Sequence, residues 1–213
     1  MTTIYFIRHA EADNTISDSR VRPLTQRGLD DRQLVTDFLA DKKIEIVLSS
    51  PYKRAIDTIA GFADKHGFEI ETIEDFRERA SDSVCEYWDS DDNRSVFIPE
   101  KFADFSRRQW TDFSYTLSDG ECLSEVQARN IAALNQVLER HKDKIIVIGT
   151  HGTALSTIIN HYDSTYGFED YMAMVYITPW VVRMDFDDKI CRKIEKIDLF
   201  DSGTNLGSQP DHA

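Results

Sequence analysis

Residues 4–14 read IYFIRHAEADN, and this stretch decides the fold. It begins with four apolar residues, Ile4 to Ile7, and then changes abruptly to Arg8, His9 and a polar run that ends at Asn14. A continuous apolar run of this kind is typical of a strand that is covered on both faces, as in parallel sheets. Because the run stops at a cation and an imidazole, we expect chemistry to begin at the carboxyl end of this strand.

The same pattern occurs twice more in the chain. Residues 44–48 run into a pair of serines and Arg54, and residues 145–149 run towards His151. Ligands of open parallel sheets bind in the crevice beyond the carboxyl ends of the strands. The sequence therefore predicts that His9, Arg54 and His151 lie together at one edge of the sheet.

Helical patterns separate these strands. Thr25 is expected to cap a helix that runs to about Ala40, and a second helix, with Pro51 in its first turn, is expected to end at Gly67. The stretch 68–75 then alternates like a strand. The order β, α, β, α, β predicts a parallel sheet with right-handed crossovers. We therefore predict an α/β fold, a three-layer α/β/α sandwich around a mostly parallel central sheet.

After the third strand the pattern loosens. Residues 78–120 are acidic and rich in aromatics, and we interpret them as an insertion with one or two helices. Its aromatics are expected to form a small core or a lid, and the core is the favoured interpretation. Ser124 and Gln127 are expected to form a capping box for the helix that follows.

The end of the chain predicts further strands and a tail. Residues 175–179, 181–186 and 189–200 look like strands, the last two joined by a tight turn. The predicted organisation is a single domain over residues 1–200 and a disordered polar tail over 201–213.

The composition limits the class of protein. Of 213 residues, 41% are hydrophobic and 30% are charged, which is typical of a globular protein. The net charge of −13 disfavours nucleic acid and anionic membrane surfaces as partners, so an anionic substrate needs a local cluster of arginines. The first strand begins too close to Met1 for a secretory signal, so we expect a cytoplasmic protein. The cysteines, Cys85, Cys122 and Cys191, include no CxxC pair and predict neither a disulfide framework nor a cysteine-rich zinc site.

Histidines and arginines at strand ends favour phosphoryl chemistry. The sequence has no GxSxG elbow and no GxxxxGK[ST] phosphate loop. An adjacent arginine disfavours a metal held by His9 and His151, and it favours a phosphate dianion, which arginine binds bidentately. One neutral imidazole can attack phosphorus, and a second, protonated imidazole can balance the charge of the transferring group. We therefore expect no metal and no other cofactor.

These stretches resemble the motifs of the histidine phosphatase superfamily, in its phosphoglycerate mutase-like branch. IYFIRHAEADN is similar to the RHGxxxxN motif of that family. The match continues, in the family's order, through LTQRG, SSPYKRAIDT, FRER, GECLSEVQAR and IGTHGTAL. These motifs span most of the chain from Ile4 to about Ile159. Six ordered motifs make the resemblance strong, whereas one RH pair would carry no weight.

The resemblance implies a role for each matched residue. His9 would be the phosphorylated nucleophile, and Glu78, in FRER, the acid that protonates the leaving oxygen and then activates water. The implied phosphate pocket consists of Arg8, Arg54 and His151, with Asn14 as a further donor. Glu121 matches a glutamate that we assign as a supporting residue near the site.

Two departures from the family pattern bear on these roles. Ala10 replaces the common glycine of RHG, as in small phosphohistidine phosphatases that carry RHAEA. The tract after Glu78 lacks the GxxEG that usually follows, so Asp82 or Glu86 are alternative proton donors.

The leading functional prediction is a metal-independent phosphatase, a phosphoric monoester hydrolase that works through a phosphohistidine. The first alternative is a phosphoglycerate mutase, which returns the phosphoryl group to its substrate. A protein-phosphohistidine phosphatase comes next, and a non-catalytic module that binds phospholigands ranks last. The expected partner is a small phosphorylated substrate, and a homodimer is compatible with the sequence.

Overall fold

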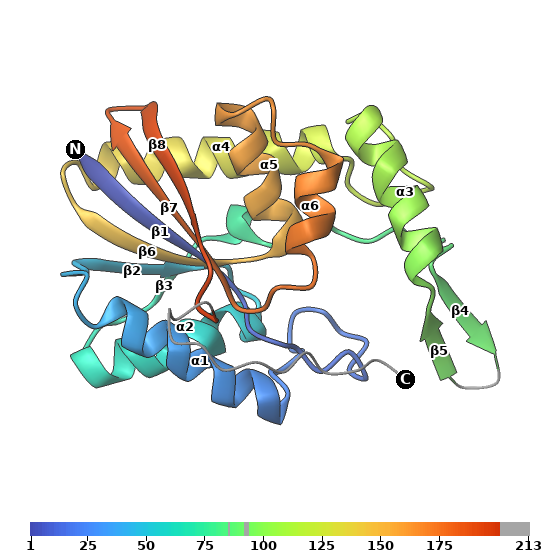
Figure 1. The fold of residues 1–213 in the computed structure, drawn as a ribbon, viewed down its shortest axis with the longest axis horizontal. Helices are drawn as coiled ribbons and strands as arrows, with labels where there is room; N and C mark the ends of the chain where they lie inside the picture. The colour runs from blue at the N-terminus through green and yellow to red at the C-terminus, as the bar shows by residue number, and fades with distance from the viewer. Residues whose placement is uncertain (85, 92–93, 201–213) are drawn as a thin grey trace.

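The computed structural model describes residues 1–84, 86–91 and 94–200, and a six-stranded sheet lies at its centre (Figure 1). The strand order is β3-β2-β6-β1-β7-β8. The strands β3, β2, β6 and β1 run parallel, β7 is antiparallel to β1, and β8 is antiparallel to β7. Their bounds are Thr2–Arg8 (β1), Ile46–Ser49 (β2), Glu71–Thr72 (β3), Ile145–Thr150 (β6), Trp180–Asp187 (β7) and Ile190–Ile197 (β8). The predicted α/β fold with a mostly parallel sheet is confirmed.

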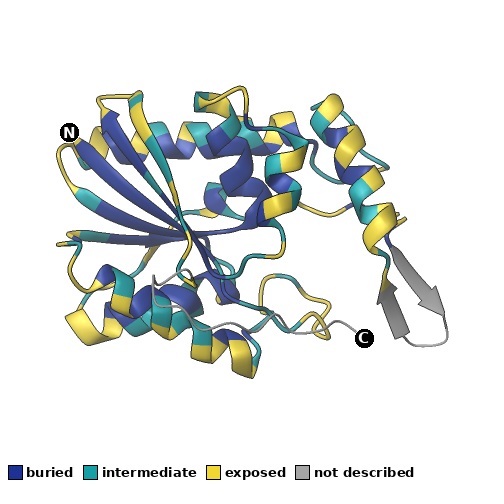
Figure 2. Cartoon of the chain, in the orientation of Figure 1, coloured by how far each residue is buried: buried dark blue, intermediate teal, exposed yellow. Residues whose placement is uncertain are grey.

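Helices cover both faces of the sheet, and the strands are buried between them (Figures 1 and 2). Along β1, Ile4 and Phe6 face one apolar cluster, and Tyr5 and Ile7 face the other. The first cluster is closed by α4, α5 and α6, and the second by α1 and α2. The bounds of these helices are Gln26–Leu39 (α1), Lys53–His66 (α2), Leu123–Arg140 (α4), Gly152–Tyr162 (α5) and Phe168–Met174 (α6).

The start of α1 and the end of α2 agree with the sequence prediction, whereas Pro51 precedes the N-cap of α2, Tyr52, and does not lie in its first turn. The Thr25 hydroxyl accepts a hydrogen bond from the Gly28 amide at the start of α1, and Gly67 ends α2 in the left-handed region with a φ of 73°. Gly28 itself is required by a close approach, since a Cβ there would collide with the carbonyl oxygen of Glu11. The loop after β1 is therefore held against the first turn of α1.

Three local predictions were wrong or too long. The capping interaction of α4 joins Glu125 to the Cys122 amide, at 3.0 Å, whereas Gln127 reaches across to the Thr157 carbonyl oxygen on α5. Residues 175–179 form a turn after α6 and not a strand, because pairing with β1 begins only at Trp180. The predicted strand 68–75 shortens to β3, since a 3-10 turn, η1 (Glu74–Phe76), buries Phe76 below the sheet edge.

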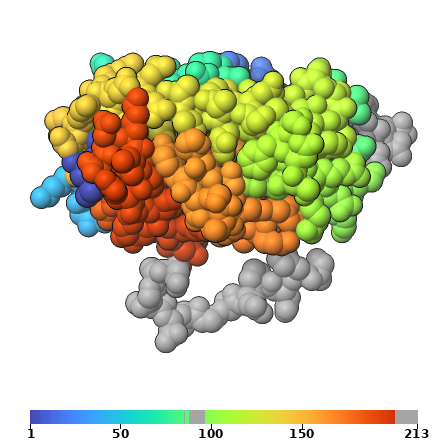
Figure 3. All heavy atoms as spheres, turned by 90° about the horizontal axis from the view of Figure 1, so that it is seen from above, coloured from blue at the N-terminus to red at the C-terminus, as the bar shows by residue number. Residues whose placement is uncertain are grey.

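The insertion contains a hairpin and one helix among its described residues. These are β4 (Trp88–Asp91), β5 (Arg94–Phe97) and α3 (Pro99–Thr111). Figures 1 and 3 show α3, in green, beside α6, in orange. Trp110 of α3 packs on Tyr171 of α6 with ring centroids 5.5 Å apart, so the predicted aromatic core exists and continues into the main domain.

The two ends of the insertion are tied together. The Glu121 amide donates to the Ala80 carbonyl oxygen at 3.0 Å. The Asp82 carboxylate accepts backbone N–H groups from the returning strand, those of Leu117, Ser118 and Gly120, at 2.8–3.2 Å. We call these paired ends, residues 80–82 and 117–121, the stalk.

Some sequence predictions are tested only in part by the structure. β7 and β8 are joined by the predicted tight turn, and Cys122 and Cys191 are free thiols. Cys85 and the tail 201–213 lie outside the described residues. Within the part of the chain that the structure describes, no helix is long and apolar enough to cross a membrane.

Candidate active site

His9 follows directly from β1 and its ring has a fixed tautomer. Its amide donates to the Thr150 carbonyl oxygen, and its Nδ1 lies 2.7 Å from the carbonyl oxygen of Ala10. A carbonyl oxygen only accepts, so Nδ1 carries the hydrogen and Nε2 keeps a free lone pair. Burial, then Arg54 and Arg8, hold the pKa of His9 well below its ordinary 6.5. His9 is therefore a neutral imidazole at neutral pH, with a nucleophilic Nε2.

His151 lies at the end of β6, fully buried, with its ring centroid 5.3 Å from that of His9. Its Nε2 contacts the Ser50 hydroxyl at 2.7 Å, and its Nδ1 has no hydrogen-bond partner among the described residues. Burial, then Arg54 and His9, hold the pKa of His151 well below 6.5. In the free site His151 is therefore a neutral imidazole, and its protonation when a phosphoryl group is bound stays a prediction.

Arg54 enters the site from the first turn of α2. Its guanidinium donates to the Ser19 carbonyl oxygen at 2.6 Å and lies over the Tyr52 ring. Burial lowers its pKa to about 10, so it stays charged at neutral pH. Neither Arg54 nor Arg8 forms a salt bridge with any residue that the structure describes. Both charges are thus available to an anion.

The Arg8 guanidinium is held by backbone carbonyl groups. It donates to the carbonyl oxygens of Met174, Val175 and Ile177 at 2.7–3.0 Å, at the C-terminal end of α6. These contacts suit a cation, because the last carbonyls of a helix are its negative end. The remaining Nε is buried, lacks a partner among the described residues, and faces Gly152 beside His151. One donor of Arg8 is therefore left for a ligand.

Glu78 is placed by the helix that follows His151. Its carboxylate accepts backbone N–H groups of Thr153 and Ala154, in the first turn of α5, at 3.1 and 3.2 Å. It also acts electrostatically on Arg8 and Arg54, which places it beside the predicted phosphate pocket. The structure thus brings together His9, His151, Arg8, Arg54 and Glu78.

The alternative proton donors are used elsewhere. Asp82 is buried, which alone would raise its pKa, but the amides of Ser118 and Gly120 and the Arg79 guanidinium lower that pKa. It is a carboxylate of the stalk. Glu86 is half-exposed and lies 3.9 Å from Arg108 on the surface. The geometry favours Glu78 over both.

Two further predicted residues lie around this group. Asn14 is on the exposed loop after β1, where its Oδ1 accepts from Arg22 at 3.0 Å, and its role as a phosphate donor stays a prediction. Glu121 bonds Arg129 and the Ala80 amide at 2.7–2.9 Å, and Arg129 in turn donates to the Glu78 carbonyl oxygen. Glu121 therefore supports the segment that carries Glu78.

Sequence reasoning missed three residues that position the site. Ser50 orients His151, and the Thr58 hydroxyl accepts the Ala10 amide at 3.0 Å, which steadies the carbonyl group next to His9. Arg22 is close enough to lower the pKa of His9 and of Arg54. The signal for Ser50 and Thr58 was their place in SSPYKRAIDT, near the end of a strand and along one helix face.

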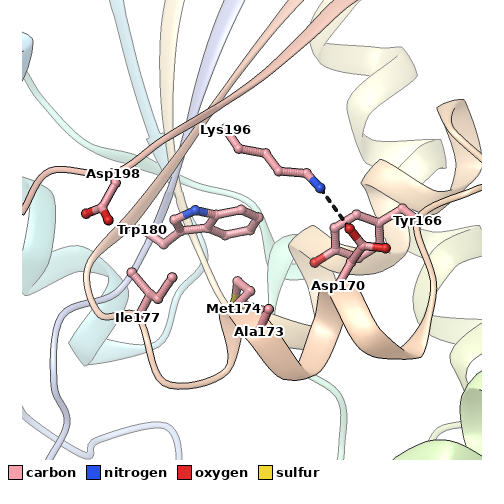
Figure 4. Close-up of a pocket in the computed structure, with 8 residues that line it drawn as sticks. All are labelled: Tyr166, Asp170, Ala173, Met174, Ile177, Trp180, Lys196 and Asp198. Carbon is pink, nitrogen blue, oxygen red and sulfur yellow. Dashed lines mark hydrogen bonds and ion pairs between the residues drawn. The ribbon is translucent and has the colours of Figure 1, made fainter. Parts of the chain in front are cut away.

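A hollow of about 240 Å³ lies behind Arg8, between α6 and the β7–β8 hairpin (Figure 4). Trp180, which pairs opposite Arg8 in the sheet, lies across it, with Met174 and Ile177 on the wall. Lys196 and Asp170 form an ion pair at 3.0 Å beside the Tyr166 ring. The lining of this hollow includes none of the predicted site residues. It does include Met174 and Ile177, whose carbonyl oxygens bind Arg8.

The arrangement of strand-end histidines and arginines agrees with a family comparison. The chain matches the model of the histidine phosphatase superfamily (branch 1) over residues 4–189. The chain belongs to this superfamily. The sequence-based assignment is confirmed.

Relatives within the histidine phosphatase superfamily include phosphatases. The chain is 31% identical over 163 residues to phosphoglycerate mutase-like protein 4 of Arabidopsis thaliana, covering 73% of this chain and 68% of the relative. It is 30% identical over 166 residues to a metal-independent phosphoserine phosphatase of the same plant, covering 74% and 67%. A shorter match, 36% over 63 residues, is to the phosphohistidine phosphatase SixA of Escherichia coli and covers 29% of this chain and 39% of SixA.

Solved structures of similar fold agree with the superfamily assignment. YhfR of Bacillus stearothermophilus superposes with a TM-score of 0.67 at 20% identity, over 90% of this chain and 95% of that one. A phosphoserine phosphatase from Entamoeba histolytica, in complex with phosphoserine, gives 0.68 at 18% identity, over 91% and 96%. At these identities the likeness shows the fold alone.

Proposed function

We propose that this histidine phosphatase superfamily member hydrolyses a phosphomonoester without a metal, through a phosphohistidine at His9. The observation that carries the proposal is the hydrogen bond from His9 Nδ1 to Ala10, which leaves Nε2 as a neutral nucleophile. Arg8 and Arg54, two buried cations without carboxylate partners among the described residues, supply the charge for a phosphate dianion. The charge that a metal would supply is thus present in the protein.

The proposed reaction has two displacements. His9 Nε2 attacks phosphorus, the P–N bond forms, and the P–O bond to the alcohol breaks while Glu78 gives its proton to the leaving oxygen. Water then attacks the phosphohistidine, Glu78 takes the proton from that water, and the P–N bond breaks to release phosphate. His151 gains a proton when the dianion arrives, because the added negative charge offsets the repulsion from Arg54.

Substitution of the nucleophile tests the proposal. We expect His9→Ala to fold but to lose turnover of p-nitrophenyl phosphate in the presence of EDTA, while the unchanged chain stays active. Rapid quench with labelled substrate should trap an acid-labile, base-stable phosphate adduct on His9. Normal turnover by His9→Ala, or loss of activity in EDTA that a divalent ion restores, would refute the mechanism.

The main alternative is a mutase, which shares the same site but returns the phosphoryl group to its substrate. A mutase acting on phosphoglycerate needs a cation for the carboxylate of that substrate. The charged residues that line the cavity beside Glu78 favour an ester without a carboxylate.

A further inference from the structure

A cavity of about 210 Å³ lies between Arg8 and Glu78 of the candidate site and residues of the insertion. Arg8 and Glu78 line its inner end, and α3 and α6 form its walls. The leaving alcohol of a phosphomonoester must occupy this space, because Glu78 is the group that would protonate its oxygen. We call this cavity the leaving-group pocket.

The walls of the leaving-group pocket are aromatic. Phe102 and Phe105 of α3, Tyr171 of α6 and Tyr87 of the insertion all line it. The Tyr87 ring is 5.4 Å from that of Phe102 and 5.2 Å from that of Phe105, and Phe102 lies 6.4 Å from Tyr171. Rings at these separations form a continuous apolar surface, and they favour a ligand with an apolar or aromatic face.

The charge in this pocket is already balanced. Besides Arg8 and Glu78, the charged residue in its described lining is Arg79. Arg79 forms a buried salt bridge with Asp82 at 3.2 Å, and its guanidinium also donates to the Glu121 carbonyl oxygen and the Tyr87 hydroxyl. A carboxylate on the leaving group would therefore compete with Asp82 for Arg79 and would lie near Glu78, which repels it.

The remaining polar groups are uncharged. Ser106 and Gln109 of α3 are both buried and line the pocket, and Thr153, whose amide donates to Glu78, lines it as well. Hydroxyl and amide groups of this kind suit an alcohol or other neutral polar substituent. The volume is below the ~300–1,000 Å³ of drug-sized sites, so it suits an alcohol of about one or two rings.

We infer that the substrate is the phosphomonoester of a small, uncharged, ring-bearing alcohol, and that carboxylated esters such as phosphoglycerate and phosphoserine are poor substrates. This inference rests on the proposed function and deepens it. It sets this chain apart from its phosphoserine phosphatase relative, although both belong to one superfamily.

A panel of esters with similar alkyl leaving groups tests the inference. The full chain is assayed in EDTA with 2-phenylethyl phosphate, glycerol 3-phosphate, 3-phosphoglycerate and phosphoserine. We expect kcat/KM for 2-phenylethyl phosphate to exceed that of each of the others by at least about tenfold, from ring contacts that the other three cannot make. Equal or higher kcat/KM for either carboxylated ester would overturn the inference.

A pair of matched variants locates the effect. Phe102→Leu keeps an apolar side chain but removes a ring from the pocket wall, and we expect it to lower kcat/KM for 2-phenylethyl phosphate several-fold more than for glycerol 3-phosphate. Phe113→Leu is the control, since Phe113 is in the same insertion but packs on Trp110 outside the pocket lining. The same loss on both esters in Phe102→Leu, or the same selectivity change in Phe113→Leu, would count against the pocket.

Failure of this inference is distinguishable from failure of the proposed function. If the chain hydrolyses p-nitrophenyl phosphate but prefers carboxylated esters, the pocket assignment fails and the phosphatase stands. If it hydrolyses none of these esters, the proposed function fails. Calorimetric affinities for 2-phenylethyl phosphate and 3-phosphoglycerate then still decide whether the pocket prefers a ring, and tighter binding of 3-phosphoglycerate would overturn that preference.

Discussion

At the scale of single residues, the two imidazoles make stability depend on pH. The fold holds the pKa values of His9 and His151 well below 6.5, whereas in the unfolded chain they return to about 6.5. Below pH 6.5 the two imidazoles therefore bind protons in the unfolded chain but not in the folded chain. The free energy of unfolding must fall as the pH falls through that range, by up to about 1.4 kcal/mol per pH unit for His151, which is fully buried.

Urea unfolding at pH 7 and pH 5.5 measures this loss. We expect His151→Gln to lose less stability between the two pH values than the unchanged chain, because glutamine does not titrate. In the unchanged chain, saturating phosphate should also reduce the stability lost between pH 7 and pH 5.5, since a bound dianion favours the protonated imidazole. An identical pH dependence in the two proteins would contradict the assignment of His151 as a neutral buried base.

Glu78 gives a second prediction at this scale. An alkyl alkoxide needs a proton as it leaves, whereas p-nitrophenolate hardly does, and general acid catalysis typically contributes about 10²- to 10⁴-fold. We expect Glu78→Gln to slow hydrolysis of 2-phenylethyl phosphate far more than that of p-nitrophenyl phosphate. Glu86→Gln is the control and should slow neither. Equal slowing of both esters in Glu78→Gln would assign the proton to another donor.

The sequence predicted which side chains meet but not how they are held. His9, Arg54 and His151 follow strand ends, so topology alone places them together. The anchors of Arg8 are backbone carbonyls of residues 174–177, and a carbonyl has no sequence signature. The neutral state of His151 could not be predicted from the sequence either, because it depends on burial and on the distances to two guanidinium groups.

At the scale of elements, the segment that carries Glu78 depends on Glu121, which lies in the stalk just before α4. The Glu121 carboxylate bonds Arg77, Arg129 and the Ala80 amide, and it thereby joins these three groups. We expect Glu121→Gln to lower the free energy of unfolding by about 1–3 kcal/mol, since partly buried guanidinium groups lose their partner. The kcat/KM for alkyl phosphates should fall as well, because Glu78 shifts with the segment.

Urea unfolding and steady-state kinetics check this prediction together. Glu139→Gln provides the control, since Glu139 near the end of α4 pairs with Lys189 on the surface and its loss should change stability by less than about 1 kcal/mol. If Glu121→Gln lowered the free energy of unfolding and kcat/KM no more than Glu139→Gln does, the supporting role of Glu121 would be contradicted.

The ends of helices and strands were predicted less well from the sequence than the helices and strands themselves. The cap at Thr25 and the end at Gly67 were predictable because each uses a residue with a specific backbone role. The cap of α4 lies two residues earlier than predicted, since Cys122 and Glu125 take the places expected for Ser124 and Gln127. Residues 175–179 carry β-branched and aromatic side chains, but β1 has no free edge left for them, because β7 fills it from Trp180 onward.

At the scale of the whole molecule, the stalk separates two tasks. The sheet, α2 and α5 carry the residues of the proposed phosphate site, whereas α3 forms one wall of the leaving-group pocket. The insertion leaves and rejoins the domain at residues bonded to each other, Ala80 with Glu121 and Asp82 with Ser118. Its removal would therefore leave the ends of the remaining chain already adjacent.

Replacement of residues 84–115 by a short glycine–serine linker tests this separation. We expect the shortened chain to hydrolyse p-nitrophenyl phosphate but to lose the preference for 2-phenylethyl phosphate over glycerol 3-phosphate. Its stability should fall, because Tyr171 loses the cover of Trp110. Retention of the full preference for the ring would show that α6 and the Glu78 segment set specificity without the insertion.

The closed stalk also bears on how such a protein can change over time. A segment whose ends meet can be lengthened, shortened or exchanged as one piece, with a small cost in loop closure. Selection can then act on the choice of alcohol while the phosphate-binding residues stay fixed. In this chain, the choice of alcohol would then evolve with the insertion, whereas the reaction would depend on the α/β domain that carries the insertion.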